Sequence, residues 1–388
     1  MTKPVETDVR TEQRGASTAN TLAVQDVLQL ALLPGIGPRH FARLIEHFGS
    51  AAAVLSASSD QLQAVEGIGA ALSQTILSAS THNYGQTAME HCRRSGLEVL
   101  LESQPEYPRP LRRIHDAPPV LFASGRIEPV DELAIAIVGT RHATAYGRMQ
   151  ATKIASGLAR CGITIISGLA RGIDGAAHQG ALDANGRTIA VLGSGHDEMY
   201  PAEHTKLAQE VAKAGCVLSE FPPWTKPRGP YFPQRNRLIS GLSLGVLVIE
   251  AADRSGSLVT ARHAMEQGRE VFALPGPVSS RVSRGCHALI RDGAKLVENA
   301  EQIIDELGPL AESVRPSPEQ DTVVRHPLEL TLNEQELTIL GLIGTEPTSI
   351  DAIISRAELP VQRVLSTLSV LEMRRLIRRL SGQFVIRL

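Results

Sequence analysis

Short apolar runs alternate with helical stretches between Ala134 and about Glu306. The runs are rich in β-branched residues and apolar on both faces, which is typical of strands in a buried parallel sheet wrapped by helices. The pattern therefore predicts a doubly wound α/β domain, in which ligands bind where a strand ends and the next loop or helix begins. The predicted strands are Ile135–Val138, Ile163–Ile166, Thr188–Leu192, Cys216–Leu218, Val246–Ile249 and Val271–Leu274.

A short repeat precedes this region. The segments Leu33–Pro38 and Val65–Ala70 both contain Gly-Ile-Gly, and both lead into a helical pattern. Two glycines allow a tight hairpin and leave backbone N–H groups near a helix N-terminus, where they can bind a phosphate. The repeat predicts an N-terminal helical domain of the tandem helix-hairpin-helix, SAM-like type. Its hairpins either contact DNA or only pack on each other.

The C-terminal part shows a second helical pattern. Prolines among acidic and polar residues predict a flexible linker over Gly308–Pro327. Helical periodicity follows over Glu334–Ile343, near Ile350 and over Val361–Arg374, and a closing strand, Gln383–Arg387, ends the pattern. Three helices and a terminal β-hairpin predict a winged helix. A basic cluster beside its third helix could bind duplex DNA, face solvent or bind a protein partner; it comprises Arg374, Arg375, Arg378 and Arg379.

These patterns divide the chain into five parts. We expect a disordered N-terminus (1–20), a helix-hairpin-helix domain (21–96), the α/β domain (97–307), a linker (308–330) and a winged helix (331–388). Residues 1–20 are polar and lack the apolar core of a secretory signal, so a cytoplasmic protein without membrane contact is expected.

Composition narrows the chemistry. The 388 residues carry a formal net charge of -2, so any contact with nucleic acid must come from a local basic patch. The four cysteines are far apart and form no CxxC pair, which predicts buried free thiols rather than disulfides or a zinc site. No metal and no cofactor is expected.

Small residues and an arginine follow the first two predicted strands. Glycines there allow a ligand to approach the backbone, N–H groups at the next helix start attract anions, and Arg141 adds a bidentate phosphate donor. Because the two turns end neighbouring strands, a phosphate site is favoured over glycines that only tighten a crossover. The predicted DNA-binding residues of these turns are Gly139, Thr140, Arg141, Ser167, Gly168, Ala170, Arg171, Gly172 and Asp174.

Two further segments carry polar residues at the start of a helix. In the first, Tyr231–Arg237, arginines can neutralise phosphates while Phe232 or Tyr231 stacks on a base, as in a single-strand-binding groove. The second, Ser255–Thr260, places hydroxyls and a glycine at a helix start. The residues predicted to bind DNA here are Phe232, Arg235, Asn236, Arg237, Gly256 and Ser257.

Taken together, the motifs resemble the DNA-processing protein A (DprA/Smf) family. The resemblance rests on Gly-Thr-Arg at 139–141, Ser-Gly-x-Ala-x-Gly-Ile-Asp-x-x-Ala-His at 167–178, Phe-Pro-x-Arg-Asn-Arg at 232–237, Gly-Ser-Leu-Val-Thr-Ala at 256–261, and Val-Phe-Ala-Leu-Pro-Gly at 271–276. It implies an extended Rossmann-like domain that binds single-stranded DNA, forms a homodimer and contacts the RecA recombinase. A protein of this kind protects incoming DNA and helps load RecA during natural transformation.

The chain departs from the family pattern at two positions. Gly229 stands where the family often has a basic residue, and Lys226 or Arg228 lies nearby as a substitute. His204 replaces the asparagine of a Tyr-Pro-x-x-Asn pattern, which is expected to alter local packing.

An enzyme is the rival class. Glycines at 193 and 195 suggest a dinucleotide loop but lack the third glycine. Asp174 and His178 lie four apart on a predicted helix, where packing is favoured over a metal site. Glu250 and Asp253 are placed as in nucleoside phosphoribohydrolases of related fold, although they could equally orient an arginine or cap a helix. We expect binding without catalytic residues, and the alternative is a phosphoribohydrolase-like nucleotide-processing enzyme.

Overall fold

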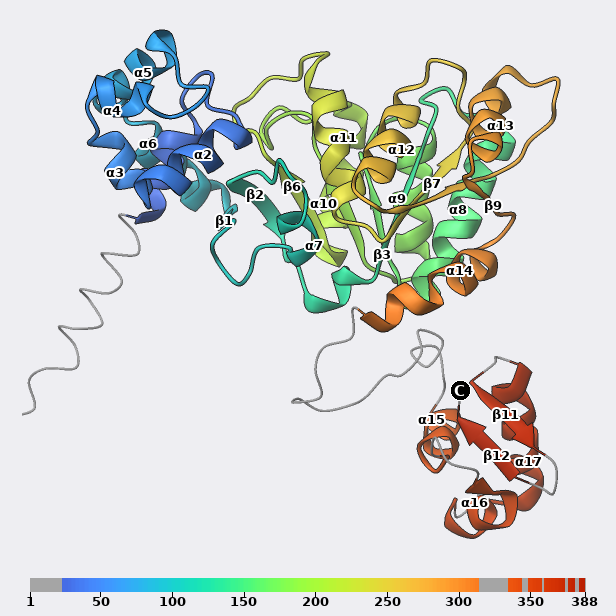
Figure 1. The fold of residues 1–388 in the computed structure, drawn as a ribbon. Coiled ribbons are helices and arrows are strands. Elements are labelled where there is room, and N and C mark those ends of the chain that lie inside the picture. The colour runs from blue at the N-terminus through green and yellow to red at the C-terminus, as the bar shows by residue number, and fades with distance from the viewer. Residues whose placement is uncertain are drawn as a thin grey trace, which may run out of the picture.

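The computed structural model describes residues 23–313, 334–343, 348–357, 359–373, 376–380 and 384–387. The expected disordered N-terminus, most of the expected linker, and Arg374 and Arg375 lie outside these residues. Figure 1 shows the arrangement of the elements along the chain.

A nine-stranded sheet forms the centre of the described chain, in the order β1-β2-β6-β5-β4-β3-β7-β8-β9. From β6 to β9 neighbouring strands are parallel. All six predicted strands are present, and Lys295–Leu296 adds the short edge strand β9. They are β3 (Ala134–Gly139), β4 (Thr164–Ser167), β5 (Thr188–Val191), β6 (Cys216–Ser219), β7 (Gly245–Ile249) and β8 (Glu270–Ala273).

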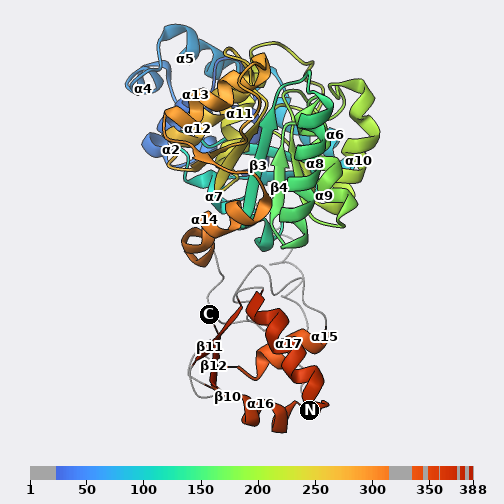
Figure 2. The ribbon, with the colours of Figure 1, turned by 90° about the vertical axis from the view of Figure 1, so that its right-hand side faces the viewer.

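Helices cover both faces of the sheet, as Figure 2 shows. On one face lie α8 (Ala145–Arg160), α9 (Ile173–Asp183) and α10 (Thr205–Ala214), and on the other lie α11 (Tyr231–Gly241), α12 (Gly256–Glu266) and α13 (Arg284–Arg291). The predicted doubly wound, Rossmann-like architecture is therefore confirmed.

Strand β3 explains this layering. Its side chains point alternately to the two faces, as the pleat of a strand requires. Ala134, Ala136 and Val138 join the core under α11, α12 and α13. Ile135 and Ile137 join the core under α8 and α9. Both faces of the strand are thus buried, which accounts for its continuous apolar run.

Two antiparallel strands extend the sheet and were not predicted. The strands β1 (Glu98–Leu101) and β2 (Val120–Gly125) pair with each other, and β2 pairs with β6. The segment between them holds the short helix α7 (Arg109–Arg112), and η2 (Pro129–Glu132) leads from β2 into β3.

The N-terminal domain is helical, as the repeat predicts. A helix at residues 23–31 precedes the first hairpin. Gly35 and Gly67 have φ of 85° and 89°, which favours glycine, while Gly37 and Gly69 precede the first residues of α2 and α5. The named helices are α2 (Pro38–Phe48), α3 (Ala51–Leu55), α4 (Ser59–Gln63), α5 (Ala70–Leu77), the 3-10 helix η1 (Ser78–Thr81) and α6 (Tyr84–Ser95).

The C-terminal domain has the predicted winged-helix elements. A three-stranded sheet in the order β10-β12-β11 accompanies the helices, and its described pairs are antiparallel. The elements are α15 (Glu334–Gly341), β10 (Thr348–Ser349), α16 (Ile350–Arg356), α17 (Val361–Met373), β11 (Ile377–Leu380) and β12 (Phe384–Arg387).

The start of the expected linker is helical. Helix α14 (Ala300–Ser313) continues past the expected boundary at 307, and its Ile303 and Leu307 are buried in the core under α8 and α9. Among the described residues, no helix combines the length and the apolar character needed to cross a membrane.

Candidate nucleic-acid interface

The candidate site is a pocket of about 210 Å³ beyond the carboxyl ends of β3, β4 and β5. Four separate segments contribute to it, in agreement with the expectation that ligands of such sheets bind beyond the strand ends. The lining residues are Arg141, His142, Gly168, Ala170, Arg171, Tyr200, Pro201, Phe232 and Arg235.

The turn from β4 into α9 forms one wall and is held in an unusual conformation. Leu169 has φ of 55°, a left-handed value that is costly for a leucine, and Nδ1 of His204 lies 2.9 Å from its carbonyl oxygen. At Gly172, with φ of 78°, an added Cβ would collide with the carbonyl oxygens of Thr140 and Arg141. His204, which departs from the family pattern, thus holds the turn that presents Ala170 and Arg171.

Buried polar side chains fix the base of the pocket. Asp174 accepts a hydrogen bond from the backbone N–H of Gly168 at 3.1 Å, and the Ser167 hydroxyl donates to the carbonyl of Ile137 at 2.6 Å. Arg235 is 3% exposed and donates to the carbonyl of Val191. Burial raises the pKa of Asp174 and lowers that of Arg235 to about 10, while each charge opposes the shift of the other. Arg235 is therefore a cation at neutral pH, and it is fixed in place.

Arg141 and Phe232 stand at the mouth of the pocket. Cζ of the exposed Arg141 lies 5.1 Å from the ring centre of Phe232, within the range of a cation–π contact. Tyr200 lies beside the same ring, with centroids 5.4 Å apart. No carboxylate in the described part of the chain pairs with Arg141. The guanidinium is thus available to an anion from solution.

Arg171 differs from Arg141 because its guanidinium already has a carboxylate partner. Both nitrogens, Nε and Nη2, donate to Glu203 at 2.7 Å. Hydrogen bonds to this carboxylate raise the pKa of Arg171 and lower that of Glu203. A phosphate that binds Arg171 must therefore compete with Glu203 or share the guanidinium with it.

Arg237, which was predicted to bind DNA, lies away from the pocket. It is 5% exposed and does not line the pocket; instead its Nη2 lies 2.5 Å from Glu220, and its Nε lies 3.5 Å from Asp116. Arg237 thus faces two carboxylates instead of the pocket, and its predicted contact with DNA stays a prediction. Positions two apart on a helix differ by about 200°, so Arg235 and Arg237 cannot face the same ligand.

The other predicted residues shape the surroundings of the pocket without lining it. Thr140 donates its N–H to the carbonyl of Glu250 at 2.8 Å, and Gly139 continues strand β3 against β7. Nδ2 of Asn236 donates to the carbonyl of Gly256 at 3.2 Å, and Ser257 is buried at the start of α12. The hydrogen bond between Asn236 and Gly256 thus connects the start of α12 to α11.

Three lining residues are absent from the prediction: His142, Tyr200 and Pro201. Tyr200 and Pro201 follow β5 by nine and ten residues. The strand-end rule that found the first two turns would have found them had it been applied to this third strand.

The residues that suggested catalysis have structural partners. Glu250 accepts hydrogen bonds from the backbone N–H and the hydroxyl of Thr144, the residue before α8. Asp253 is exposed and lies 4.0 Å from Arg284. Nδ1 of His178 lies 2.8 Å from the Thr188 hydroxyl, so His178 and Asp174 face different partners.

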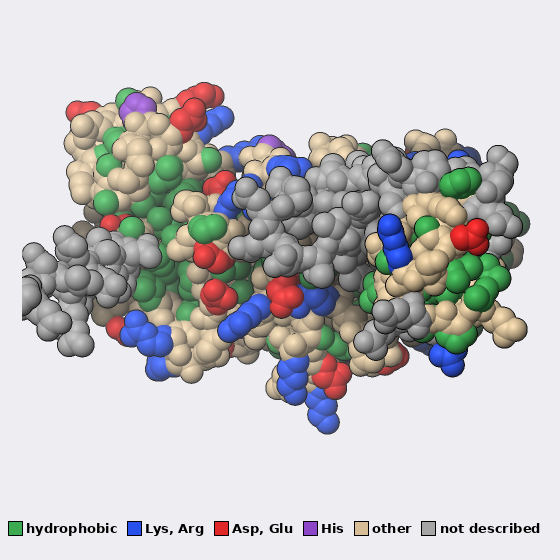
Figure 3. All heavy atoms as spheres, turned by 90° about the horizontal axis from the view of Figure 1, so that it is seen from below, with side chains coloured by type: hydrophobic (Ala, Val, Ile, Leu, Met, Phe, Trp, Pro, Cys, Tyr) green, Lys and Arg blue, Asp and Glu red, His purple; other side chains and the backbone are tan. Residues whose placement is uncertain are grey.

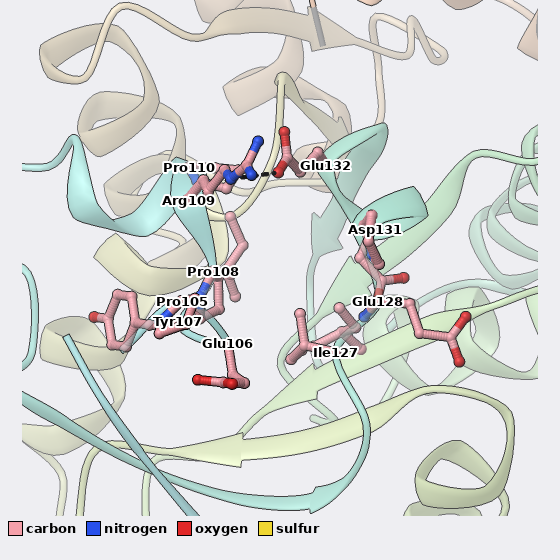
Figure 4. A pocket seen from close by; sticks show the side chains of 13 residues that line it. Pro105, Glu106, Tyr107, Pro108, Arg109, Pro110, Ile127, Glu128, Asp131 and Glu132 are labelled. Atoms are coloured by element: carbon pink, nitrogen blue, oxygen red, sulfur yellow. Dashed lines mark hydrogen bonds and ion pairs between the residues drawn. The ribbon is translucent and has the colours of Figure 1, made fainter. Parts of the chain in front are cut away.

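A larger pocket of about 450 Å³ lies near the amino ends of the strands and differs in charge (Figure 4). Glu106, Glu128, Asp131 and Glu132 line it, and Nε of Arg109 lies 3.6 Å from Glu132. Figure 3 shows acidic and basic side chains interspersed over the visible surface on this side of the molecule. Carboxylates repel phosphates, so the smaller pocket is the better nucleic-acid site.

Three family models match the chain. Residues 98–308 match DNA recombination-mediator protein A, residues 324–383 match the DprA winged helix domain, and residues 24–80 match a SAM-like helix-hairpin-helix tandem. The chain is 44% identical over 280 residues to Protein Smf of Escherichia coli (strain K12), covering 72% of this chain and 74% of that protein. It is 46% identical over 216 residues to DNA processing protein DprA of Bacillus subtilis (strain 168), covering 55% and 73%.

Solved structures agree with these matches. DNA processing protein A from Streptococcus pneumoniae has a TM-score of 0.62 at 34% identity and covers 72% of this chain and 95% of its own. DNA processing protein A from Helicobacter pylori, solved to study its single-stranded DNA binding mode, has a TM-score of 0.50 at 31% identity and covers 55% and 96%. By sequence and by fold, the chain belongs to the DNA recombination-mediator protein A family, known as DprA or Smf.

Proposed function

We propose that this protein binds single-stranded DNA in the pocket beyond β3, β4 and β5, with Arg141 on a backbone phosphate and Phe232 on a base. The observation that carries the proposal is the exposed Arg141 beside the Phe232 ring, above the buried cation Arg235. A cation beside an aromatic ring is the chemistry of single-strand binding sites. Single-stranded DNA binding by the Helicobacter pylori relative supports the same assignment.

The size of the pocket favours part of a polymer over a whole cofactor. Its volume of about 210 Å³ is below the range of about 300–1,000 Å³ usual for small-molecule sites. A phosphate and one unpaired base need less space than a dinucleotide.

A variant of the ring tests this assignment. We expect Phe232→Ala to weaken binding to labelled oligothymidine by about 1–3 kcal/mol, with nearly the same slope of log affinity against log salt, because stacking releases no counterions. Fluorescence anisotropy over a salt series measures both quantities. A folded variant with wild-type affinity would contradict base stacking at Phe232.

The wider role that we propose is that of a cytoplasmic recombination mediator, which protects incoming DNA and helps load the RecA recombinase during natural transformation. Membership of a family described as recombination mediators supports this role. We also propose a homodimer as the working unit, as the family resemblance implies. Sedimentation of the purified protein tests the dimer. Joint-molecule formation by RecA on DNA covered with single-strand-binding protein tests the loading, and no gain over RecA alone would contradict it.

We further propose that the protein acts by binding and not by catalysis. The contacts of Glu250 with Thr144 support this view, because they assign the carboxylate to the start of α8. Incubation with nucleoside monophosphates should release no free base. Release of base that is lost in Glu250→Gln would establish the phosphoribohydrolase-like alternative.

A further inference from the structure

Trp224 is the single tryptophan of the chain, and its side chain is exposed. It lies on the loop between β6 and α11, 38% exposed, and its indole meets the imidazole of His91 edge to face, with centroids 5.6 Å apart. Nε2 of His91 lies 2.8 Å from Asp197, so the imidazole is itself held in place. An anchored aromatic side chain that remains exposed is available to stack on a ligand.

The loop around Trp224 is fixed. The carbonyl of Pro223 accepts the N–H of Asp197 at 2.9 Å, and the carbonyl of Thr225 accepts the N–H of Gly195 at 2.8 Å. The N–H of Thr225 donates to the carbonyl of Pro222 at 2.9 Å. A loop ordered before binding loses little conformational freedom when a ligand arrives.

The same loop lies next to the candidate pocket. A Cβ on Gly193 would lie 2.7 Å from Cδ1 of Phe232, and a Cβ on Gly195 would collide with the carbonyl oxygens of Pro222 and Pro223. Gly193 and Gly195 are two residues apart, so their Cα atoms are separated by at most about 7 Å. Phe232 and the loop that carries Trp224 therefore both pack against the segment 193–195, Phe232 at Gly193 and the loop at Gly195.

The loop that carries Trp224 also carries positive charge, which attracts the phosphates of DNA. Lys226 and Arg228 are exposed, and neither forms an ion pair with any residue that the structure describes. The two acidic neighbours each have a partner: Asp197 lies against His91, which contacts Trp224, and Glu220 lies against Arg237. An indole beside two unpaired cations matches the combination of stacking and backbone neutralisation used for single strands.

We propose that Trp224 is a second base-stacking platform, which receives a nucleotide of the same strand as it leaves the pocket, and that Lys226 and Arg228 contact the backbone beside it. This inference rests on the proposed function. It extends the binding path from the pocket toward helix α6 of the N-terminal domain, which carries His91.

Native fluorescence of the full-length protein tests the platform directly, because all tryptophan emission comes from residue 224. We expect a long oligothymidine, of about 16 nucleotides, to quench this emission on binding, since thymine stacks on the indole. Trp224→Ala should lose at least about fivefold in affinity for the long strand and little for one of about 4 nucleotides, which can fill the pocket alone. Trp224→Phe should recover most of the loss.

The controls separate this inference from the proposed function. Met265→Ala, which removes an even more exposed apolar side chain at the end of α12 (52% exposed against 38% for Trp224), should leave affinity and quenching unchanged. Arg141→Ala should weaken binding to both strands while saturating DNA still quenches the emission. If wild-type protein binds DNA without quenching, and Trp224→Ala keeps its affinity, the platform is refuted and the pocket stands. If wild-type protein binds no oligothymidine, both proposals fail.

Discussion

Arg235 and Arg237 lie two positions apart in α11 and have different partners. Arg235 is packed against Gly168 at the base of the pocket, whereas Arg237 pairs with Glu220 and Asp116. Removing one partner of a buried ion pair leaves the other charge buried without compensation. Substitution of the buried Arg237 should therefore reduce stability, whereas substitution of the exposed Arg141 should not.

We therefore expect Arg141→Ala to change DNA binding and Arg237→Ala to change stability. Arg141→Ala should keep its melting temperature, weaken binding to every sequence alike, and flatten the slope of log affinity against log salt by about 0.7. Arg237→Ala should lose about 3–5 kcal/mol of stability, because Glu220 remains buried without its partner. Thermal melts and salt-dependent anisotropy on the same preparations measure both. A stable Arg237→Ala with a flattened salt slope would restore Arg237 to the binding site.

Glu203 competes with phosphate for Arg171. We expect Glu203→Gln to raise the affinity for oligothymidine modestly, since the neutral amide holds the guanidinium less firmly than the carboxylate does. Glu210→Gln is the matched control, because it removes the same charge from an exposed position on α10. Equal gains in the two variants would mean that only net charge matters.

His178 makes stability depend on pH. Burial lowers its pKa from 6.5 to about 3, with smaller contributions from His204 and Arg235. Between these values the unfolded chain binds a proton that the folded chain does not, so stability falls as the pH decreases. We expect a contribution approaching 1.4 kcal/mol per pH unit below about pH 6. Urea unfolding from about pH 4.5 to 6.5 should show a smaller slope for His178→Asn than for wild type, and equal slopes would contradict this origin.

Burial on both faces made six strands of the central sheet predictable from the sequence. The six predicted strands are buried on both faces or nearly so, and this produces the continuous apolar runs from which they were inferred. Strand β1 begins with the exposed Glu98 and holds only three apolar residues. Strand β2 does contain a buried apolar run, Val120–Ala123, but this run lies before Ala134, outside the region of alternating runs and helices from which the strands were inferred.

The turns that line the site could be predicted because they follow the ends of predicted strands. The orientation of the Arg237 side chain could not, because it depends on ion pairs with Glu220 and Asp116, which come from other segments of the chain.

The N-terminal domain shares a core with β1 and β2. Leu28, Ala88 and Cys92 pack with Leu101, Val120 and Phe122. A fragment that begins at residue 97 therefore uncovers three buried side chains of the sheet.

We expect the fragment 23–313 to melt at a clearly higher temperature than 97–313, because each uncovered side chain costs about 1.5–3 kcal/mol when fully exposed. Both fragments keep α14, and both keep every residue that lines the pocket. Where folded, both should retain most of the affinity for short oligothymidine. Calorimetry and anisotropy measure the two quantities, and equal melting temperatures would show that the shared core contributes little.

At the scale of the whole molecule, a formal net charge of -2 leaves DNA binding to local features. The pocket offers cations and aromatic rings, whereas the larger cavity at the opposite strand ends is lined by carboxylates. On α17, Val361 and Leu365 lie four positions apart and present exposed apolar side chains on one face, whereas the exposed Arg363 lies two positions from each and points to another side of the helix. This helix surface is less suited to a phosphate backbone than the mouth of the pocket is.

The full-length protein should therefore prefer single-stranded to duplex DNA and show little choice of sequence. Neutralised phosphates and a stacked base read no pattern of base edges, and a pocket of about 210 Å³ admits an unpaired base but not a base pair inside a duplex. Competition against labelled oligothymidine by unlabelled single strands and duplexes of matched length measures the preference. A chain that ends at Ser313 lacks the winged helix and should keep the same preference, because the pocket is intact. Equal competition by duplex that disappears in this shortened chain would move the main site to the winged helix, whereas equal competition that persists would show that the pocket does not select unpaired bases.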